Sequence, residues 1–375
     1  MENSIENASL MQILSEITDF RNPNQITYTV AEVLIVVIIG VIAGMKNSLH
    51  IGEFAKANKL WFQTKLGLEN VPSHDTIDRI LTFISYNELE AAFAIWLDDI
   101  FKNKHIRKRL KIDGKKIDKN SRNTTTIVRA FLSGLNQVKG AVRIHEYQNE
   151  ITTIPKLIKK LYIKGYLVSI DAIGTQSDIA NLILKQEANY LLPVKKNQKL
   201  LYEDLQLYAE TEIEDGLKNK NCTVFETYNE GHGRLEKRKC YAFNNIDWIK
   251  EFHPKWSHIK SFCLLVSTGQ EKNKKAVKTY RVFISNLLLN ASEFIYEIRD
   301  HWSIENQLHW PLNQSFSENK IFSKSSNFVI NFSCILTTAL TLIYNLKSNN
   351  LSFNLQKLKL SWNLDLILEC LYLKV

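Results

Sequence analysis

Residues Leu167 to Gln176 read LVSIDAIGTQ, in which a mostly apolar run leads directly into Asp171. A near-continuous apolar run of this length is typical of a strand covered on both faces of a sheet, so we predict that Asp171 lies where a central strand ends. A buried carboxylate without a partner is costly, and Asp171 should therefore meet a cation, a hydrogen-bond donor or water. The residue could equally be a structural cap for the helix predicted by the residues that follow it.

A second stretch of the same kind is RLKIDGKK, Arg109 to Lys116, in which Asp113 closes the alternation of Leu110 and Ile112. The surrounding segment is strongly basic: residues 101–122 hold ten Lys or Arg against two aspartates, a local balance of +8 in a chain whose total is +9. A basic run is often only a solvated face or a linker. Around a carboxylate at a strand end, it favours a polyanionic substrate.

The composition is that of an ordinary globular protein, with 375 residues, 45% hydrophobic and 23% charged, and the chain is long enough for more than one domain. The five cysteines show no paired CxxC spacing, which argues against a zinc knuckle and a disulfide framework. No P-loop, dinucleotide fingerprint or G-x-S-x-G motif occurs in the sequence. The uncharged run Val33 to Met45 is 13 residues long, shorter than the ~20 that span a bilayer, so we expect a buried core helix, no signal peptide and a cytoplasmic protein.

Residues 9–102 show helical spacing without a clear period-two alternation. Ile51 to Leu66 is predicted as one helix, and VPSHDTIDRILTF, Val71 to Phe83, as another that Ser73 would cap. Two short helices joined by a turn could form a helix-turn-helix that reads DNA, although such pairs are more often only packing units. The sequence leaves both interpretations open.

The elements between Arg109 and Val194 follow a definite order. Three strands joined by short turns are followed by a helix, the strand that ends at Asp171, a second helix and a fifth strand. This is the order of the ribonuclease-H-like fold, in which the first and fourth strands lie side by side. Asp113 and Asp171, 58 positions apart in the sequence, would then be neighbours, and a divalent metal would remove their mutual repulsion.

Two further regions complete the pattern. Residues 200–288 are β-rich and too long for a loop, which indicates an insertion into the sheet protein. Helical spacing returns in ASEFIYEIRDHWSIENQLHW, Ala291 to Trp310, where His301, Glu305 and His309 fall at i, i+4 and i+8 on one predicted face. These three residues could bind zinc, but HExxH is absent, and a packed or hydrogen-bonded histidine is the more common case.

Seven motifs occur in a fixed order along almost the whole chain. Each is weak alone: VPSHDTIDRI (Val71 to Ile80), IDGK (Ile112 to Lys115), NEITTIP (Asn149 to Pro155), SIDAIGTQ (Ser169 to Gln176), KKNQ (Lys195 to Gln198), GHGRLEKR (Gly231 to Arg238) and RDHWSIENQLHW (Arg299 to Trp310). Together they resemble the ISAs1 family of transposases, which includes the H-repeat-associated proteins, within the wider IS4-like class of DDE transposases.

The resemblance implies an α/β fold with a ribonuclease-H-like catalytic core at residues 105–345, a β-rich insertion at about 200–288, an N-terminal helical domain at 1–104 and a C-terminal tail at 346–375. It also implies that Asp113, Asp171 and Glu305 are a D-D-E set of catalytic metal ligands. Two Mg²⁺ ions, or Mn²⁺ in their place, roughly 3.5–4 Å apart would activate a water and later a 3′-hydroxyl for in-line attack on a phosphodiester. The implied function is therefore that of an insertion-sequence transposase, an enzyme of DNA strand cleavage and strand transfer.

The implied partners are double-stranded DNA, as terminal inverted repeats and target, and a second copy of the chain in a synaptic homodimer, without a membrane. Basic residues near the site are expected to hold the DNA backbone rather than to read bases. The candidate DNA-binding residues are Lys115, Lys116, Lys195, Lys196, Asn197, Arg234, Arg238 and His301.

Some positions depart from the family's pattern. The arginine and glycine that usually follow IDGK are replaced by Asp118 and Lys119. After the glutamate helix, two expected aspartates are Asn313 and Asn319, and an expected arginine is Phe322. Two hypotheses therefore stay open: an active transposase, and a catalytically impaired or repurposed descendant that only binds DNA.

Overall fold

The strands of the protein form one mixed sheet, in the order β3-β2-β1-β4-β5-β9-β8-β7-β6. The computed structural model describes residues 9–117, 125–218, 222–231, 234–271, 277–346 and 351–371. β2 pairs antiparallel with both β1 and β3, whereas β1, β4 and β5 run parallel to one another. This is the ribonuclease-H-like arrangement that the order of the elements predicts, and the predicted fold class is confirmed. The strands are β1 (Arg109–Ile117), β2 (Thr125–Leu132), β3 (Gln137–Ile144), β4 (Leu167–Ile170), β5 (Asn189–Val194), β6 (Cys222–Gly231), β7 (Arg234–Phe243), β8 (Ser261–Glu271) and β9 (Val277–Ser285).

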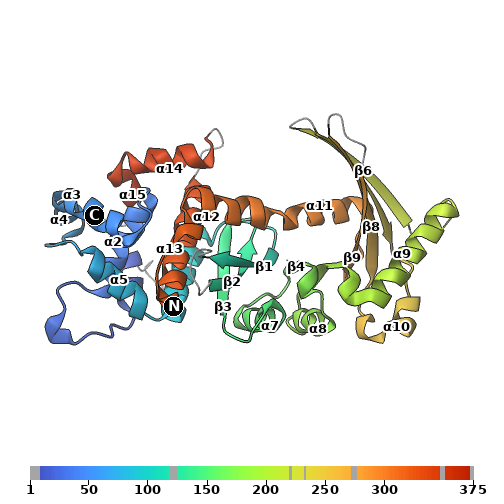
Figure 1. The fold of residues 1–375 in the computed structure, drawn as a ribbon, viewed down its shortest axis with the longest axis horizontal. Helices are drawn as coiled ribbons and strands as arrows, with labels where there is room; N and C mark the ends of the chain where they lie inside the picture. The colour runs from blue at the N-terminus through green and yellow to red at the C-terminus, as the bar shows by residue number, and fades with distance from the viewer. Residues whose placement is uncertain are drawn as a thin grey trace, which may run out of the picture.

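The β-rich segment expected at residues 200–288 extends this sheet instead of forming a separate one. Its strands pair antiparallel in sequence order, β6 with β7, β7 with β8 and β8 with β9. β9 then pairs antiparallel with β5, so backbone hydrogen bonds link the insertion directly to the core. α9 (Lys199–Glu214) and α10 (Trp248–Phe252) lie beside these strands at one end of the molecule (Figure 1).

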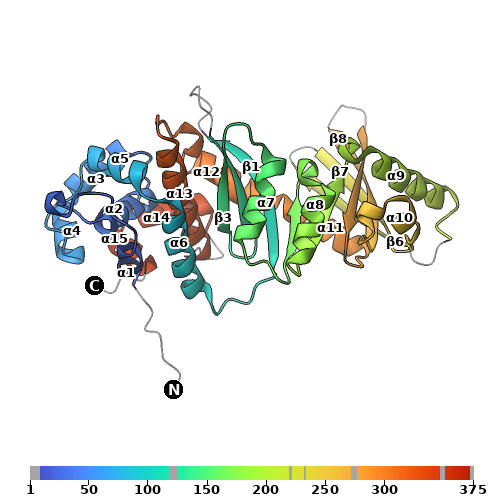
Figure 2. The same cartoon turned by 90° about the horizontal axis from the view of Figure 1, so that it is seen from below.

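Helices cover both faces of the core strands. α7 (Glu150–Lys160) and α8 (Ser177–Lys185) lie on one face, and α11 (Ala291–His301) crosses the other (Figures 1 and 2). Each of the three helices buries a stripe of apolar residues three or four positions apart, which is the spacing of an amphipathic helix. Val168 and Ile170 of β4 are consequently buried, as the apolar run before Asp171 predicts.

A helical region precedes the sheet and is joined by the last three helices of the chain. Every residue of α2 is buried except Glu32, so the uncharged run is the core helix that the sequence predicts. α14 and α15 pack on α2, which places the C-terminal segment against the N-terminal helices. The helices of this region are α1 (Leu10–Ser15), α2 (Val30–Ile42), α3 (Ser48–Ala57), α4 (Lys59–Leu66), α5 (His74–Phe83), α6 (Tyr86–Phe101), α13 (Ser326–Leu346), α14 (Phe353–Ser361) and α15 (Leu364–Cys370).

α13 joins the helical region to the sheet. It contacts α2, α5 and α6 on one side and β2 and β3 on the other. By length and composition this helix could cross a membrane, but 78% of its most apolar window is buried inside the protein, as in the core helix of a soluble protein.

Two predicted helices differ in detail. The single helix expected from Ile51 to Leu66 breaks at Asn58 into α3 and α4, and the Asn58 side chain donates a hydrogen bond to the carbonyl oxygen of Phe54 at 2.8 Å. The helix expected from Ala291 to Trp310 is α11 followed by a π-helical turn, Ile304–His309, and then α12 (Trp310–Gln314). By contrast, Ser73 caps α5 as predicted.

Candidate active site

Asp113 lies in the middle of β1, not at a strand end as the sequence predicts, because β1 continues to Ile117 in its pairing with β2. Asp171 directly follows the last residue of β4, the adjacent parallel strand. The register of β1 and β4 pairs Lys111 with Ser169, and each aspartate comes two residues later in the chain. Lys111 contacts Asp300 of α11, and Ser169 contacts His301 of the same helix. Because residues two apart on a strand share a face, both aspartates extend toward the side of the sheet that bears α11.

Asp171 is at once a structural cap and a candidate ligand. Its Oδ1 accepts hydrogen bonds from the backbone N–H groups of Ile173 and Gly174, at 3.1 and 3.3 Å, and so begins the 3₁₀ turn Ala172–Gly174. Asn197 donates from its side chain to the carbonyl oxygen of Ala172 at 2.8 Å. This contact holds the KKNQ segment against the turn that follows Asp171.

The π-helical turn brings Glu305 and His309 to Asp113. His309 Nδ1 lies 3.0 Å from Glu305 Oε2 and 3.5 Å from Asp113 Oδ2. Among the described residues, one ligand atom from each of Asp113, Glu305 and His309 lies within 4.8 Å of the others. The three could therefore hold one metal ion, and Asp171 stands beside this cluster rather than in it. His309 is the residue that sequence reasoning noticed on the helix face but did not assign to the site.

The electrostatics of the cluster reflect crowded negative charge. Burial, followed by the charge of Asp171, raises the pKa of Asp113 to about 7, with further contributions from Glu150 and Glu305, while the N–H of Gly114 opposes the rise. The hydrogen bond from His309 lowers the pKa of Glu305. Burial lowers the pKa of His309, which favours a neutral ring that donates from Nδ1. His309 Nε2 is buried and has no hydrogen-bond partner among the described residues.

Glu150 is a further carboxylate that the sequence did not single out. It is the first residue of α7 and packs over Gly114, where a Cβ atom would lie 2.2 Å from Glu150 Oε1. Burial and the charge of Asp171 raise the pKa of Glu150, and Lys116 opposes them. A side chain at position 114 would therefore displace the Glu150 carboxylate from this place. Acidic residues are common in the first turn of a helix, where Glu150 lies directly after the cap residue Asn149. The sequence around Glu150 therefore gave no sign of a functional role.

Lys115 is turned into the protein. Its Nζ donates to Glu318 Oε2 at 2.9 Å and to the backbone oxygen of His309 at 3.0 Å. Glu318 is fully buried and also binds Arg129 of β2 and the hydroxyl of Ser333 of α13. Burial opposes ionisation of Glu318, but Arg129 and Lys115 hold its pKa at about 2.

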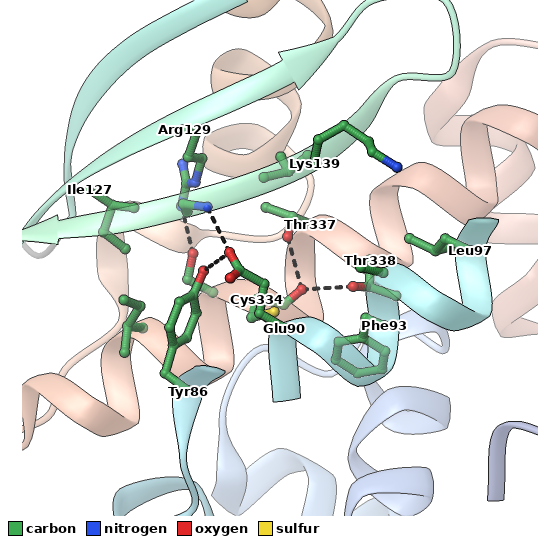
Figure 3. A pocket seen from close by; sticks show the side chains of 15 residues that line it. Tyr86, Glu90, Phe93, Leu97, Ile127, Arg129, Lys139, Cys334, Thr337 and Thr338 are labelled. Carbon is green, nitrogen blue, oxygen red and sulfur yellow. Dashed lines mark hydrogen bonds between the residues drawn. The ribbon is translucent and has the colours of Figure 1, made fainter. Parts of the chain in front are cut away.

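A small closed cavity lies beside Arg129. Figure 3 shows the Arg129 side chain reaching from the sheet toward α6 and α13, near Tyr86, Glu90 and Cys334. The cavity volume is about 30 Å³, enough for a water or two but not for a nucleotide. It therefore belongs to the packing of the sheet against the helices.

The other candidate DNA-binding residues lie in different settings. Lys116, Lys195, Lys196 and Asn197 are exposed. The side chain of Arg238 pairs with Glu236 at 2.7 Å, and that of Arg234 lies outside the described part of the structure, as do Asp118 and Lys119.

His301, the remaining DNA-binding candidate, is directed into the protein. Its Nδ1 lies 2.8 Å from the hydroxyl of Ser169, and burial, followed by the charge of Lys111, lowers its pKa to about 4.

Comparisons with known proteins show which family the chain belongs to. Residues 102–342 match the family model described as "Transposase DDE domain", and residues 11–97 match the one described as "DDE_Tnp_1-associated". The chain belongs to the DDE transposase family. The Escherichia coli K12 protein named "H repeat-associated putative transposase YhhI" is 31% identical over 353 residues, which cover 91% of this chain and 92% of that protein.

Another relative and a solved structure also match most of this chain. "Putative transposase YncI" of Escherichia coli O157:H7 is 31% identical over 347 residues, covering 90% of this chain and 88% of that protein. A cryo-EM structure of the piggyBac transposase synaptic complex with hairpin DNA matches with a TM-score of 0.40 and 12% identity, over 95% of this chain and 77% of that one. The resemblance of this DDE transposase to the H-repeat-associated proteins is confirmed.

A DDE transposase domain implies use of a divalent metal, and the residues present fit one. Carboxylate oxygens are the ligands that Mg²⁺ and Mn²⁺ prefer. Burial, followed by the charge of Asp171, raises the pKa of Asp113, and a bound cation removes this cost of ionising it. Asp113, Glu305 and His309 are the residues that would hold the metal, and Asp171 lies beside them.

We expect Asp113→Asn to raise the thermal midpoint of the metal-free transposase at pH 8. The folded protein retains a proton on Asp113 between its ordinary pKa of 3.8 and about 7, so the stability of the wild type falls as pH rises through this range. The variant should lose that part of the pH dependence. Thermal unfolding in EDTA at pH 5.5 and pH 8 measures the effect.

Mn²⁺ should raise the midpoint of the wild type at pH 8 and leave that of Asp113→Asn nearly unchanged, because binding to the folded state alone stabilises it. Glu203→Gln, at an exposed carboxylate of α9, is the matched control and should behave as the wild type. A metal-free Asp113→Asn protein that is less stable than the wild type at pH 8 would contradict the electrostatic account.

Proposed function

We propose that the protein is the DNA transposase of an insertion sequence, an enzyme that cleaves a DNA strand and transfers its 3′-end to a target. The observation that carries the proposal is the cluster of Asp113, Glu305 and His309 beside Asp171, in a chain that matches the transposase DDE domain over residues 102–342. Phosphodiester hydrolysis and transesterification need little covalent chemistry from the protein. They need positioned charge, which this cluster offers.

Each residue of the cluster has a distinct role in the proposal. Bound Mg²⁺ or Mn²⁺ would supply a nucleophile at neutral pH and stabilise the leaving oxygen. Asp113 must lose its proton before it can act as a ligand, so the affinity for the metal should rise as pH rises toward about 7. His309 donates to Glu305, which keeps that carboxylate ionised and turned toward Asp113.

The DNA backbone would lie along the edge where β1, β4 and β5 end. Lys116, Lys195, Lys196 and Asn197 are exposed there, and Arg234 and Arg238 belong to the hairpin of β6 and β7. Lys115 and His301 are not among the proposed DNA-binding residues, because their side chains form hydrogen bonds inside the protein, with Glu318 and Ser169 respectively. The proposal includes a homodimer with one catalytic site for each DNA end.

We also propose a role for each of three successive parts of the chain. Residues 1–104 would be an associated helical domain, 105–345 the catalytic domain with its insertion at about 200–288, and 346–375 a C-terminal segment that packs on α2. DNA contacts are proposed for the catalytic domain only.

The proposal predicts that Asp113→Asn, Asp171→Asn and Glu305→Gln each abolish Mg²⁺-dependent strand cleavage. Each change removes one anionic metal ligand and leaves the exposed lysines in place. The substrate is a labelled duplex that carries the terminal sequence flanking the gene. Cleavage is followed on a denaturing gel, and DNA binding in Ca²⁺ by mobility shift.

Glu203→Gln is again the matched control and should cleave as the wild type. DNA binding should change by no more than about threefold in the three variants, since none of the carboxylates is proposed to contact a phosphate directly. Full cleavage by Glu305→Gln would exclude Glu305 from the catalytic set.

A second prediction concerns the backbone contact. Lys195→Gln and Lys196→Gln should each weaken binding to all DNA sequences alike and reduce the dependence of log Kd on log salt by about one unit. Fluorescence anisotropy with a terminal and an unrelated duplex, at several salt concentrations, measures both quantities. Lys250→Gln, on α10, is the control and should leave the slope unchanged. A loss confined to the terminal duplex would indicate base readout instead.

A catalytically impaired descendant is the second candidate function. The observation that favours it is that Asn313 Oδ1 and Asn319 Oδ1 are buried and have no hydrogen-bond partner within the part of the chain that the structure describes. These are the two positions where the resemblance leads one to expect aspartate. Phe322, in place of an arginine, is 76% exposed and lines a cleft of about 380 Å³ with Lys46 and Lys320.

If the protein is impaired in this way, Asn313→Asp and Phe322→Arg together should raise strand cleavage by about 10–100-fold, the usual size of effects on groups that orient metal ligands. Phe322→Arg should also tighten DNA binding, because it adds a phosphate donor beside two lysines. Vigorous cleavage by the wild type, unchanged in the double variant, would refute impairment. Cleavage rates of both proteins on the same duplex decide the matter.

A further inference from the structure

Every second residue of β1 contacts a residue of the segment 297–318, and the contacts follow the same order in both parts of the chain. Because side chains alternate along a strand, residues 109, 111, 113 and 115 share the face that is turned toward α11 and the π-helical turn. Each of the four has a polar partner there, and three of the partners are carboxylates. The contacts are Arg109 with Glu297, Lys111 with Asp300, Asp113 with His309, and Lys115 with Glu318.

These contacts tie β1 to three successive parts of the chain. Arg109 and Lys111 pair with Glu297 and Asp300 of α11, and Lys115 pairs with Glu318 beyond the π-helical turn. The turn Ile304–His309 lies between these ion pairs, and in this arrangement Glu305 and His309 lie beside Asp113.

Lys115 makes the contact nearest to the catalytic cluster. Its two hydrogen bonds go to Glu318 and to the backbone oxygen of His309, the last residue of the π-helical turn. The Lys115 side chain is only 10% exposed and that of Glu318 is not exposed at all. Arg129 and Ser333 hold Glu318 from two other elements, so the ammonium group has a fixed anchor on one side and the turn on the other.

We propose that Lys115 is a positioning residue, which ties the turn bearing Glu305 and His309 to the strand bearing Asp113 and so sets the spacing of the metal ligands. This role rests on the proposed metal site. It assigns the lysine of the IDGK motif to the interior of the enzyme rather than to a DNA phosphate.

Mn²⁺ binding to the DNA-free protein tests the role without reference to activity. Binding is measured by isothermal titration calorimetry, with electron paramagnetic resonance of free Mn²⁺ as the second readout. Lys115→Met keeps most of the side chain volume and removes the charge and both hydrogen bonds. We expect it to weaken Mn²⁺ binding by about 10–100-fold, as changes that disorient metal ligands commonly do. Metal-free DNA binding and its salt dependence should stay as in the wild type.

Two control variants separate positioning from general stability and from DNA contact. Arg109→Met removes an ion pair of the same series at a position four residues from Asp113 on the same strand. It should lower stability while leaving the affinity for Mn²⁺ within about threefold of the wild type. Lys116→Met removes the exposed neighbour on the opposite face and should not affect Mn²⁺ binding.

Glu318 keeps its ion pair with Arg129 when Lys115 is replaced, so its charge still has one partner. If Lys115→Met does not fold, Lys115→Gln takes its place. The shorter, neutral amide keeps a polar group beside Glu318 but removes the charged link to His309, and the same loss of Mn²⁺ affinity is expected.

The outcomes are distinguishable. A wild type that binds no Mn²⁺ would overturn the proposed metal site itself, and the role of Lys115 with it. A wild type that binds Mn²⁺, with equal affinity in Lys115→Met, would overturn the positioning role alone. A lower salt dependence of DNA binding in Lys115→Met, with unchanged Mn²⁺ affinity, would show a phosphate contact and overturn it as well.

Discussion

Repulsion between carboxylates gathered at one edge of a sheet is the constraint on which this structure depends. Parallel pairing of β1 and β4 places Asp113 and Asp171 together, Glu305 approaches from the π-helical turn, and Glu150 from α7. Ionising Asp113 is costly at this place, because burial, followed by the charge of Asp171, raises its pKa to about 7. Nothing in the local backbone would favour this crowding, so it must be held by the rest of the fold. Such an arrangement is reasonable in a protein whose function requires a cation at that place.

The carboxylates are held in this arrangement mainly by positively charged side chains inside the protein. Arg109, Lys111, Lys115 and Arg129 are largely buried and each is paired with an acidic residue from the segment 297–318. Replacing such pairs by apolar residues often stabilises a protein, so stability alone does not explain them. They do define one register between a strand and a helix, which apolar contacts would define less sharply. The strongly basic stretch 101–122 therefore serves two purposes, with some residues inside the protein and others, such as Lys116, at its surface.

The helical region and the catalytic edge are connected through α13. Ser333 of that helix binds Glu318, while Asn331 donates to the carbonyl oxygens of Leu81 and Ile84 near the end of α5. Buried polar contacts of α13 thus reach both Glu318, beside the cluster of Asp113, Glu305 and His309, and the N-terminal helices. The unpartnered oxygens of Asn313 and Asn319 lie in the same segment of chain, between the cluster and α13. Small changes in this segment could influence the site without touching its ligands.

The sequence by itself determined the strand that leads into Asp171, the presence of Asp113 in a second strand, the buried helix α2, the cap at Ser73 and, through the order of its elements and motifs, the fold and the family. It was wrong in placing Asp113 at a strand end, because β1 continues to Ile117 by pairing with β2. These features depend on local periodicity and on residues close together in the chain. Only the tertiary structure decided that Lys115 points inward, that Glu150 packs over Gly114, that a π-helical turn turns His309 toward Asp113, and that the insertion continues the central sheet. Periodicity tells which face of an element is covered, but not what covers it. Lys115 and Glu318 are separated by 203 residues, and an ion pair over that distance leaves no pattern in the neighbourhood of either residue.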